Sequence, residues 1–265
     1  MWDGRVETRK ARICSFALVL IALFAGTATI HAQAPPSPAS SGPASSAPAT
    51  RFVVVLDAAH GGSDAGGSLA TQPGQTQAEK AYTLALSVRL RSLLGARGIA
   101  VVTTRESDTA VDNNRRAEIA NHANAAACIS LHATQVGSGV HIYTSSLTPA
   151  DPARLTPWKT AQAAWITRSL ALAGVVNSAL THAGIAVTLG RTGLPAVDSM
   201  TCPAVAIEIA PKAASDQDQT SNQAQASSLD DPQYQAQIAQ ALAAAVLEWR
   251  STAWRDNDSS PGAQP

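Results

Sequence analysis

The stretch VVVLDAAHGGSDAGG (residues 53–67) reads as a strand that ends in a glycine-rich loop, with His60 at the junction. Its apolar residues run continuously instead of alternating with polar ones, which is typical of a strand covered on both faces of a parallel sheet. A histidine in this place has three interpretations: it binds a metal, it shapes a phosphate-binding loop, or it fills a turn. The choice among these three interpretations depends on the residues in the rest of the chain.

The rest of the chain alternates between strand-like and helical patterns. Short runs rich in Val and Ile predict strands at 52–57, 99–105, 128–133 and 204–210, with a less buried one at 139–145. Apolar residues at helical spacing predict helices at 78–97, 113–125, 160–183 and 232–250. This alternation predicts a single α/β domain, in which a mainly parallel twisted sheet is flanked by helices on both faces.

The chain is expected to begin with a targeting segment. Basic residues precede an apolar, uncharged run over 13–30, and small residues follow it, which is the pattern of a secretory signal peptide. The run is also close to the length of a membrane span, so the alternative for residues 1–34 is a membrane anchor. Either way we expect an exported protein that lies in the periplasm or is associated with the cell envelope, with 13–30 as the tether if the segment stays uncleaved.

Two further segments have compositions that cannot build a core. Residues 35–50 consist almost entirely of Pro, Ala, Ser and Gly and predict a disordered linker. The composition of residues 253–265 predicts a disordered tail. Residues 51–252 remain for the folded domain, which is long enough for one good core and is expected to be a monomer.

Charge and cysteine content narrow the classes of partner. The formal net charge is zero and no basic patch is interleaved with aromatic residues, so nucleic acid is excluded as a partner. Cys128 and Cys202 remain in the exported part, each at the start of an apolar strand-like run. They can pair in an oxidising compartment or stay as two buried thiols, and the sequence leaves both alternatives open.

Polar residues gather where the predicted strands end. His60, His132 and Glu208 each lie at the end of such a strand or just past it. Sites in open α/β sheets form outside the carboxyl ends of the strands, so these three residues are expected to converge. Glu79 opens the helix 78–97, and the glycine loop before it can bring Glu79 beside His60.

These four residues form a chemically complete set for amide hydrolysis. Two histidines and one carboxylate, with a position left open for water, are a recurring catalytic zinc site. A zinc ion lowers the pKa of its water to about 7 and polarises a carbonyl group. Glu208 is then the candidate general base, which takes the proton from the water and passes it to the leaving nitrogen.

Each residue also has a structural explanation. A histidine beside glycines is often a turn residue, and His132 alone fits a hydrogen-bonded histidine of the core. Glu79 in a first helical turn complements the helix dipole. Glu208 is the hardest to explain in this way, because a charge in a buried apolar strand is costly unless it is paired or functional. Three further histidines have no paired ligand nearby and are interpreted as structural: His122, His141 and His182.

The phosphate-binding interpretation of the glycine loop is the weakest of the three. A glycine loop before a helix can bind anions. Here no Lys or Arg lies between Gly67 and Glu79, and the spacing of a P-loop is absent. A G-x-S-x-G stretch, which would indicate a serine hydrolase, is also absent.

Four segments in order resemble one known family. They are VVLDAAHGGSDAGG (54–67), EKAYTLALSVRLRSLLGARGIAVVTTRESD (79–108), RAEIANHANAAACISLHA (116–133) and MTCPAVAIEIA (200–210). Together they resemble the zinc-dependent N-acetylmuramoyl-L-alanine amidases, the bacterial cell-wall amidases, over about residues 52–249. The ordered set is far more specific than any single segment.

The resemblance implies a function and a role for particular residues. It implies hydrolysis of the amide bond between N-acetylmuramic acid and L-alanine in peptidoglycan, with Zn²⁺ as cofactor. The implied zinc ligands are His60, Glu79 and His132, and the implied catalytic base is Glu208. Arg105 and Arg116 fall on family positions that support the fold and the site.

This sequence departs from the family pattern beside the site. It has Ala58-Ala59 where the family has Pro-Gly, and Thr134 where the family has Asn. The Gly-Phe that usually follows the catalytic glutamate is replaced by a polar stretch. These changes affect substrate contacts and supporting residues, so the alternative function is a weakened or inactive peptidoglycan-binding module on the same fold. The segment 146–162 is too short for the helical lid of some members, which predicts an open site.

Overall fold

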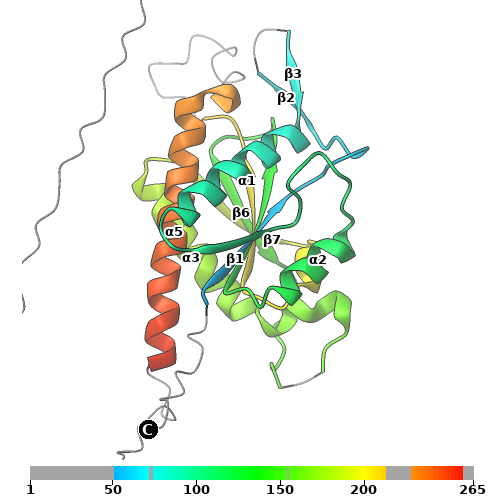
Figure 1. Cartoon of the computed structure of the whole chain (residues 1–265), viewed down its shortest axis with the longest axis vertical. Coiled ribbons are helices and arrows are strands. Elements are labelled where there is room, and N and C mark those ends of the chain that lie inside the picture. Colours follow the sequence, from blue (N-terminus) through cyan, green and yellow to red (C-terminus); the bar gives the residue numbers. More distant parts are fainter. Residues whose placement is uncertain (1–50, 72–73, 154, 213–227, 259–265) are drawn as a thin grey trace, which may run out of the picture. The chain divides into compact units, whose positions relative to one another are not determined.

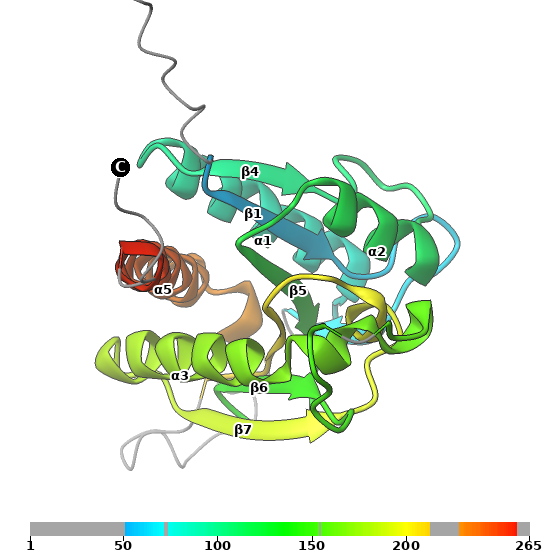
Figure 2. The same cartoon turned by 90° about the horizontal axis from the view of Figure 1, so that it is seen from below.

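A six-stranded sheet forms the centre of this computed structural model, which describes residues 51–258 except 72–73, 154 and 213–227. The order of the strands is β4-β1-β5-β8-β6-β7, and Figure 2 shows most of them side by side. Their bounds are β1 Val53–Ala58, β4 Ala100–Thr103, β5 Ala127–Ala133, β6 Val140–Ser145, β7 Val187–Thr192 and β8 Ala204–Ile209. All neighbouring strands are parallel except β6 and β8, so the prediction of a mainly parallel sheet is confirmed.

Two features of the strands were not predicted. The edge strand β7 has a half-exposed sequence with Gly190 in its middle, and it therefore lacks the continuous apolar run of a buried strand. A two-stranded hairpin, β2 (Ser68–Ala70) and β3 (Thr76–Ala78), lies within the glycine-rich loop and projects from the rest of the domain (Figure 1). Its strands of three residues are too short to show a periodicity.

The helices lie at the predicted positions, but one of them is divided in two. They are α1 (Glu79–Gly95), α2 (Asn113–His122), α3 (Ile166–His182) and α5 (Pro232–Asp258), with short 3-10 helices η1 (Trp158–Ala164), η2 (Val197–Ser199) and η3 (Ser228–Asp230). The predicted helix 160–183 is divided into η1 and α3. No single described helix is long and apolar enough to span a membrane; η1 and α3 meet the length and composition test only as a pair, which is bent by 67°.

The end of α5 corrects one predicted boundary. The helix continues past residue 250 to Asp258 and so includes the beginning of the segment 253–265, which the composition predicts to be disordered. No Pro or Gly interrupts the chain before Pro261, so nothing in the sequence ends the helix earlier. The predicted signal peptide or anchor (1–34) and the predicted linker (35–50) lie outside the described residues.

The two faces of the sheet are covered differently, because side chains alternate along each strand. On one face Val54 and Leu56 belong to a large aliphatic core with α1, α3 and α5, and α5 lies between the other two helices (Figure 2). On the opposite face Val55, Cys128 and Ala204 form a smaller core with α2 and the segment around η2. We call this side the α2 face. Its small cover leaves room for a site.

A disulfide bond decides between the two states that the sequence leaves open for the cysteines. Cys128 in β5 is bonded to Cys202, which lies just before β8, and both residues are almost fully buried. The bond therefore fixes the segment around η2 to a central strand on the α2 face.

Candidate metal centre

Three residues far apart in the sequence come together at the carboxyl end of the sheet. His60 follows β1, Glu79 is the first residue of α1, and His132 lies near the end of β5. One ligand atom of each lies within 4.8 Å of the others. Glu79 is in the middle: its Oε2 is 3.1 Å from Nε2 of His60, and its Oε1 is 3.1 Å from Nδ1 of His132.

This donor set fits a single zinc ion. Ligand atoms on a tetrahedral zinc, at about 2.0–2.1 Å from the metal, are separated from one another by about 3.3 Å. Each histidine nitrogen already lies at about this separation from one oxygen of Glu79, His60 from Oε2 and His132 from Oε1, and one ligand atom of each residue lies within 4.8 Å of the others. With two imidazole nitrogens and one carboxylate, the site would leave one coordination position open. His60 and His132, which the strand ends predict to converge, therefore do converge, and Glu79 lies between them as the glycine loop allows.

The carboxylate of Glu79 is held in its ionised form. Burial by itself would raise the pKa of this side chain, but hydrogen bonds from His132 and from the backbone N–H groups of Gly67 and Ala133 outweigh it and lower the pKa to about 2. A carboxylate that is buried and still charged is suited to a cation. The glycine loop contributes directly, since Gly67 donates to Oε2 at 2.8 Å.

Asp64 orients the ring of His60, and the sequence did not identify it. Its Oδ2 lies 2.8 Å from Nδ1 of His60, and this hydrogen bond is the main reason for the lowered pKa of Asp64. A tight turn brings the two together, because the backbones of Gly61 and Asp64 bond to each other in both directions. With Nδ1–H donating to Asp64, the Nε2 lone pair faces Glu79 and is free for a metal.

Two buried arginines hold the strained loop that carries His60. The backbone of His60 is left-handed, with φ of 60°, which is unfavourable for a residue with a side chain. Arg116 donates to the carbonyl oxygens of His60 and Ala58, at 2.7 Å each. Arg105 donates to the carbonyl oxygens of Ala58 and Ala59, at 2.9 Å each. The arginines therefore support the loop in the way that the resemblance implies.

Asp57 links this support to the floor of the site. Its buried carboxylate pairs with Arg116 at 2.6 Å and accepts hydrogen bonds from the hydroxyl groups of Thr104 and Ser130, at 2.7 Å each. All three partners are themselves buried. Because they supply a cation and two hydrogen bonds, the buried charge of Asp57 is compensated. In the sequence, the only indication of this buried network is that a charged residue, Asp57, directly follows an apolar strand-like run.

Glu208 is a neighbour of the donor set of His60, Glu79 and His132 but is not part of it. It is half-buried in β8 and stands in register with His132 of the neighbouring parallel strand, so both side chains are on the α2 face. Its carboxylate makes no hydrogen bond or ion pair to any residue that the structure describes. The structure thus brings together all four predicted residues, three as a compact donor set and Glu208 as a free neighbour.

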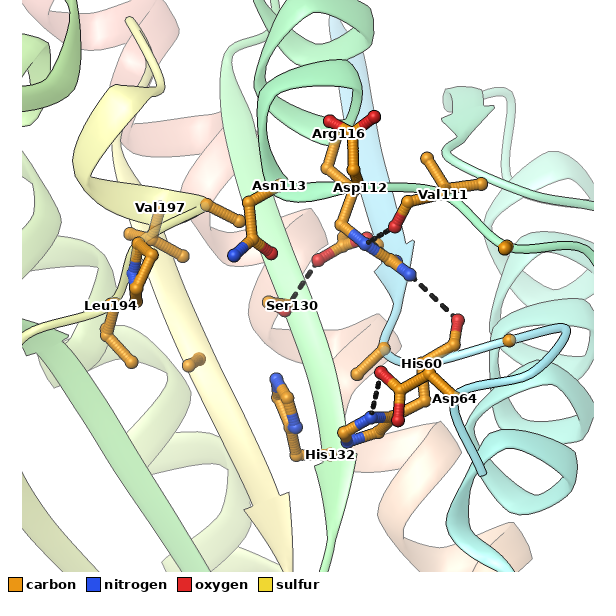
Figure 3. A pocket seen from close by; sticks show the side chains of 17 residues that line it. His60, Asp64, Val111, Asp112, Asn113, Arg116, Ser130, His132, Leu194 and Val197 are labelled. Carbon is orange, nitrogen blue, oxygen red and sulfur yellow. Dashed lines mark hydrogen bonds and ion pairs between the residues drawn. The ribbon is translucent and has the colours of Figure 1, made fainter. Parts of the chain in front are cut away.

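A cavity of about 580 Å³ opens next to the cluster on the α2 face. The imidazoles of His60 and His132 lie at its edge, and Leu194 and Val197 form the wall across from His60 (Figure 3). Asn113 of α2 also lines the cavity. The volume is within the usual range of ligand sites, and it can hold a group of the size of a sugar ring or a dipeptide.

Comparison with known proteins agrees with this fold. A germination-specific N-acetylmuramoyl-L-alanine amidase of Bacillus subtilis is 33% identical over 105 residues, which are 34% of this chain and 42% of that protein. A probable cell wall amidase, LytH, of Staphylococcus saprophyticus is 48% identical over 58 residues, which are 22% of this chain and 19% of that protein. These matches cover less than half the length of either curated relative.

Solved structures extend the likeness to the whole domain. An N-acetylmuramoyl-L-alanine amidase of Clostridium difficile 630 superposes with a TM-score of 0.57 at 20% identity, over 77% of this chain and 98% of the other. The catalytic domain of CwlV, an amidase of Bacillus (Paenibacillus) polymyxa, gives 0.55 at 24% identity, over 76% and 98%. The family model described as N-acetylmuramoyl-L-alanine amidase matches residues 54–248. The chain therefore belongs to the N-acetylmuramoyl-L-alanine amidase family.

Proposed function

We propose that this protein is a zinc-dependent hydrolase that cleaves the amide bond between N-acetylmuramic acid and L-alanine in peptidoglycan, outside the cytoplasm. The observation that carries the proposal is the donor set of His60, Glu79 and His132, whose ligand atoms lie within 4.8 Å of one another beside a cavity. Membership in the amidase family supports the same reaction.

The proposed roles follow from the positions of the side chains. His60, Glu79 and His132 would hold the metal, with Asp64 fixing the first ring. When bound there, a zinc ion supplies Lewis acidity to the scissile carbonyl and lowers the pKa of water. The Glu208 carboxylate accepts the proton of the attacking water as the new C–O bond forms. It then donates this proton to the amide nitrogen as the C–N bond breaks.

The products are a free carboxylate on the lactyl group of the sugar and a free amine on L-alanine. The substrate is expected to lie on the α2 face, where the cavity joins the cluster. Export of the protein, by a signal peptide or with residues 13–30 as a membrane tether, would bring the domain to the periplasm or cell envelope. We propose that the protein is a monomer, in which a linker at 35–50 joins the catalytic domain to the N-terminal segment.

A second candidate is a module that binds peptidoglycan without cleaving it. Thr134 favours it: its hydroxyl accepts a hydrogen bond from Val136 N–H at 3.1 Å, so it completes a local turn where the family has a side-chain amide. Two carboxylates favour the hydrolase over the binding module. Glu79 is buried and ionised, and Glu208 lies beside the donor set, and a binding module has no need for either charge.

The test is the release of free amino groups from purified peptidoglycan by the zinc-loaded protein, together with its zinc content. We expect one zinc per chain, and we expect Glu208→Ala to abolish release while zinc is retained. His182→Ala, which changes an exposed histidine of α3, is the matched control. Binding of muropeptides by the wild type with zinc but without release would support the second candidate instead.

A further inference from the structure

His141 of β6 faces the proposed base directly. It stands opposite Glu208 in the antiparallel pair of β6 and β8, while His132 stands in register with Glu208 on the other side. The three side chains therefore form one row across the α2 face. Cβ atoms of directly opposed residues in an antiparallel pair are about 4.5–5.5 Å apart, so the imidazole of His141 is within reach of the Glu208 carboxylate.

The ring of His141 is fixed by its surroundings. Its Nδ1 is 2.6 Å from the hydroxyl oxygen of Thr188 in β7, and the ring stacks against Tyr143 with 6.5 Å between the centroids. The backbone of Gly137 closes over the other end, because a Cβ at this position would lie 2.8 Å from Nε2 of His141. An imidazole held in this way has little freedom to choose another partner.

The second nitrogen of this ring, Nε2, lacks a hydrogen-bond partner among the described residues. This nitrogen is also buried. A buried polar atom without a partner is unfavourable, and such atoms are rare in folded proteins unless they have a function. When the Thr188 hydroxyl donates to Nδ1, the proton of the neutral ring lies on Nε2, which then is a donor beside a carboxylate.

We propose that His141 is a positioning residue that acts through Glu208. In the working enzyme Nε2–H of His141 donates to the Glu208 carboxylate and turns it toward the open position of the metal site. The chain keeps an otherwise unsatisfied buried nitrogen because its partner is this carboxylate in its active orientation. The inference rests on the proposed function, and it assigns a role to a histidine that its sequence context identifies only as structural.

The test compares three substitutions of His141 by steady-state kinetics on a soluble muropeptide with zinc-loaded protein. Glutamine carries an amide N–H near the position of Nε2, whereas asparagine carries it near Nδ1 and alanine carries none. We expect His141→Ala and His141→Asn to lower kcat about 10- to 100-fold, since a misplaced base loses part of its 10²- to 10⁴-fold effect. KM should stay within about twofold, zinc content should not change, and His141→Gln should recover kcat to within about fivefold of the wild type.

The asparagine and glutamine variants control for folding, since both place a polar amide in the same buried pocket. A kcat for His141→Ala within about threefold of the wild type would overturn the inference, as would equal losses for His141→Gln and His141→Asn. A double-mutant cycle tests the route of the effect: in a Glu208→Ala background, His141→Ala should cause no further loss. A further loss there of the same size as in the wild type would also overturn it.

The outcome also separates this inference from the function on which it rests. If the wild-type protein with zinc releases no amine, the proposed function fails and the inference fails with it. If the wild type is active, Glu208→Ala is inactive and His141→Ala behaves as the wild type, only the role of His141 is refuted. His182→Ala, on the exposed side of α3, should match the wild type in every assay.

Discussion

Replacement of Asp64 tests whether the cluster is a metal site with a supporting hydrogen bond. Asp64→Ala removes the acceptor that lies 2.8 Å from Nδ1 of His60, and the ring can then rotate or change its tautomer. Loss of such a partner typically weakens metal binding 10- to 100-fold. The side chain of Asp64 is 65% exposed, so water can take its place, and we expect the lower end of that range. Tenfold corresponds to about 1.4 kcal/mol.

The assay is competition for zinc between the metal-free protein and a fluorescent chelator of known affinity at neutral pH. Asp64→Asn, which keeps an oxygen acceptor without the charge, is expected to lose only about threefold, since the charge-assisted bond becomes a neutral one. Asp151→Ala is the matched control, because Asp151 is exposed and its side chain accepts a hydrogen bond from the backbone N–H of Ala153 in its own turn. A zinc affinity of Asp64→Ala within twofold of the wild type would refute the reasoning.

Three further predictions concern stability. Removing the bond between Cys128 and Cys202, which are 74 residues apart in the sequence, should destabilise the protein by about 4 kcal/mol on the chain-entropy estimate, measured by urea unfolding of the double alanine variant. Arg116→Met leaves the buried Asp57 carboxylate without its cation and should lower the free energy of unfolding by about 3–5 kcal/mol; a loss below 1 kcal/mol would contradict the network. The pKa of Glu79 is lowered from 4.5 to about 2, so in the metal-free protein its stabilisation is complete above pH 4.5 and is lost as the pH falls toward 2. Glu79→Gln should flatten this part of the pH profile of unfolding.

Much of the fold was predictable because the central strands are buried on both faces. A continuous run such as 53–57 leaves few alternatives to a parallel strand, and the ends of such strands meet at one edge of the sheet. This is why His60, His132 and Glu208 could be placed together before their distances were known. The edge strand β7 could not be predicted, because one-sided exposure removes the apolar run.

The missed parts of the site depend on three-dimensional contacts. The role of Asp64 depends on a turn of five residues whose backbone bonds to itself, and exposed aspartates in glycine loops are common without such a role. His141 could not be recognised, because its neighbour across the sheet depends on β6 running antiparallel to β8, which the sequence does not indicate. The disulfide likewise required the distance between two strands that only the fold determines.

The central claim is that His60, Glu79 and His132 bind one zinc ion. The most direct measurement is a crystal structure of the zinc-loaded protein with anomalous diffraction recorded on both sides of the zinc absorption edge. The account predicts a single anomalous peak with one atom of each of the three side chains at about 2.0–2.2 Å. A zinc ion bound elsewhere, or no peak between these three residues at saturating zinc, would contradict it.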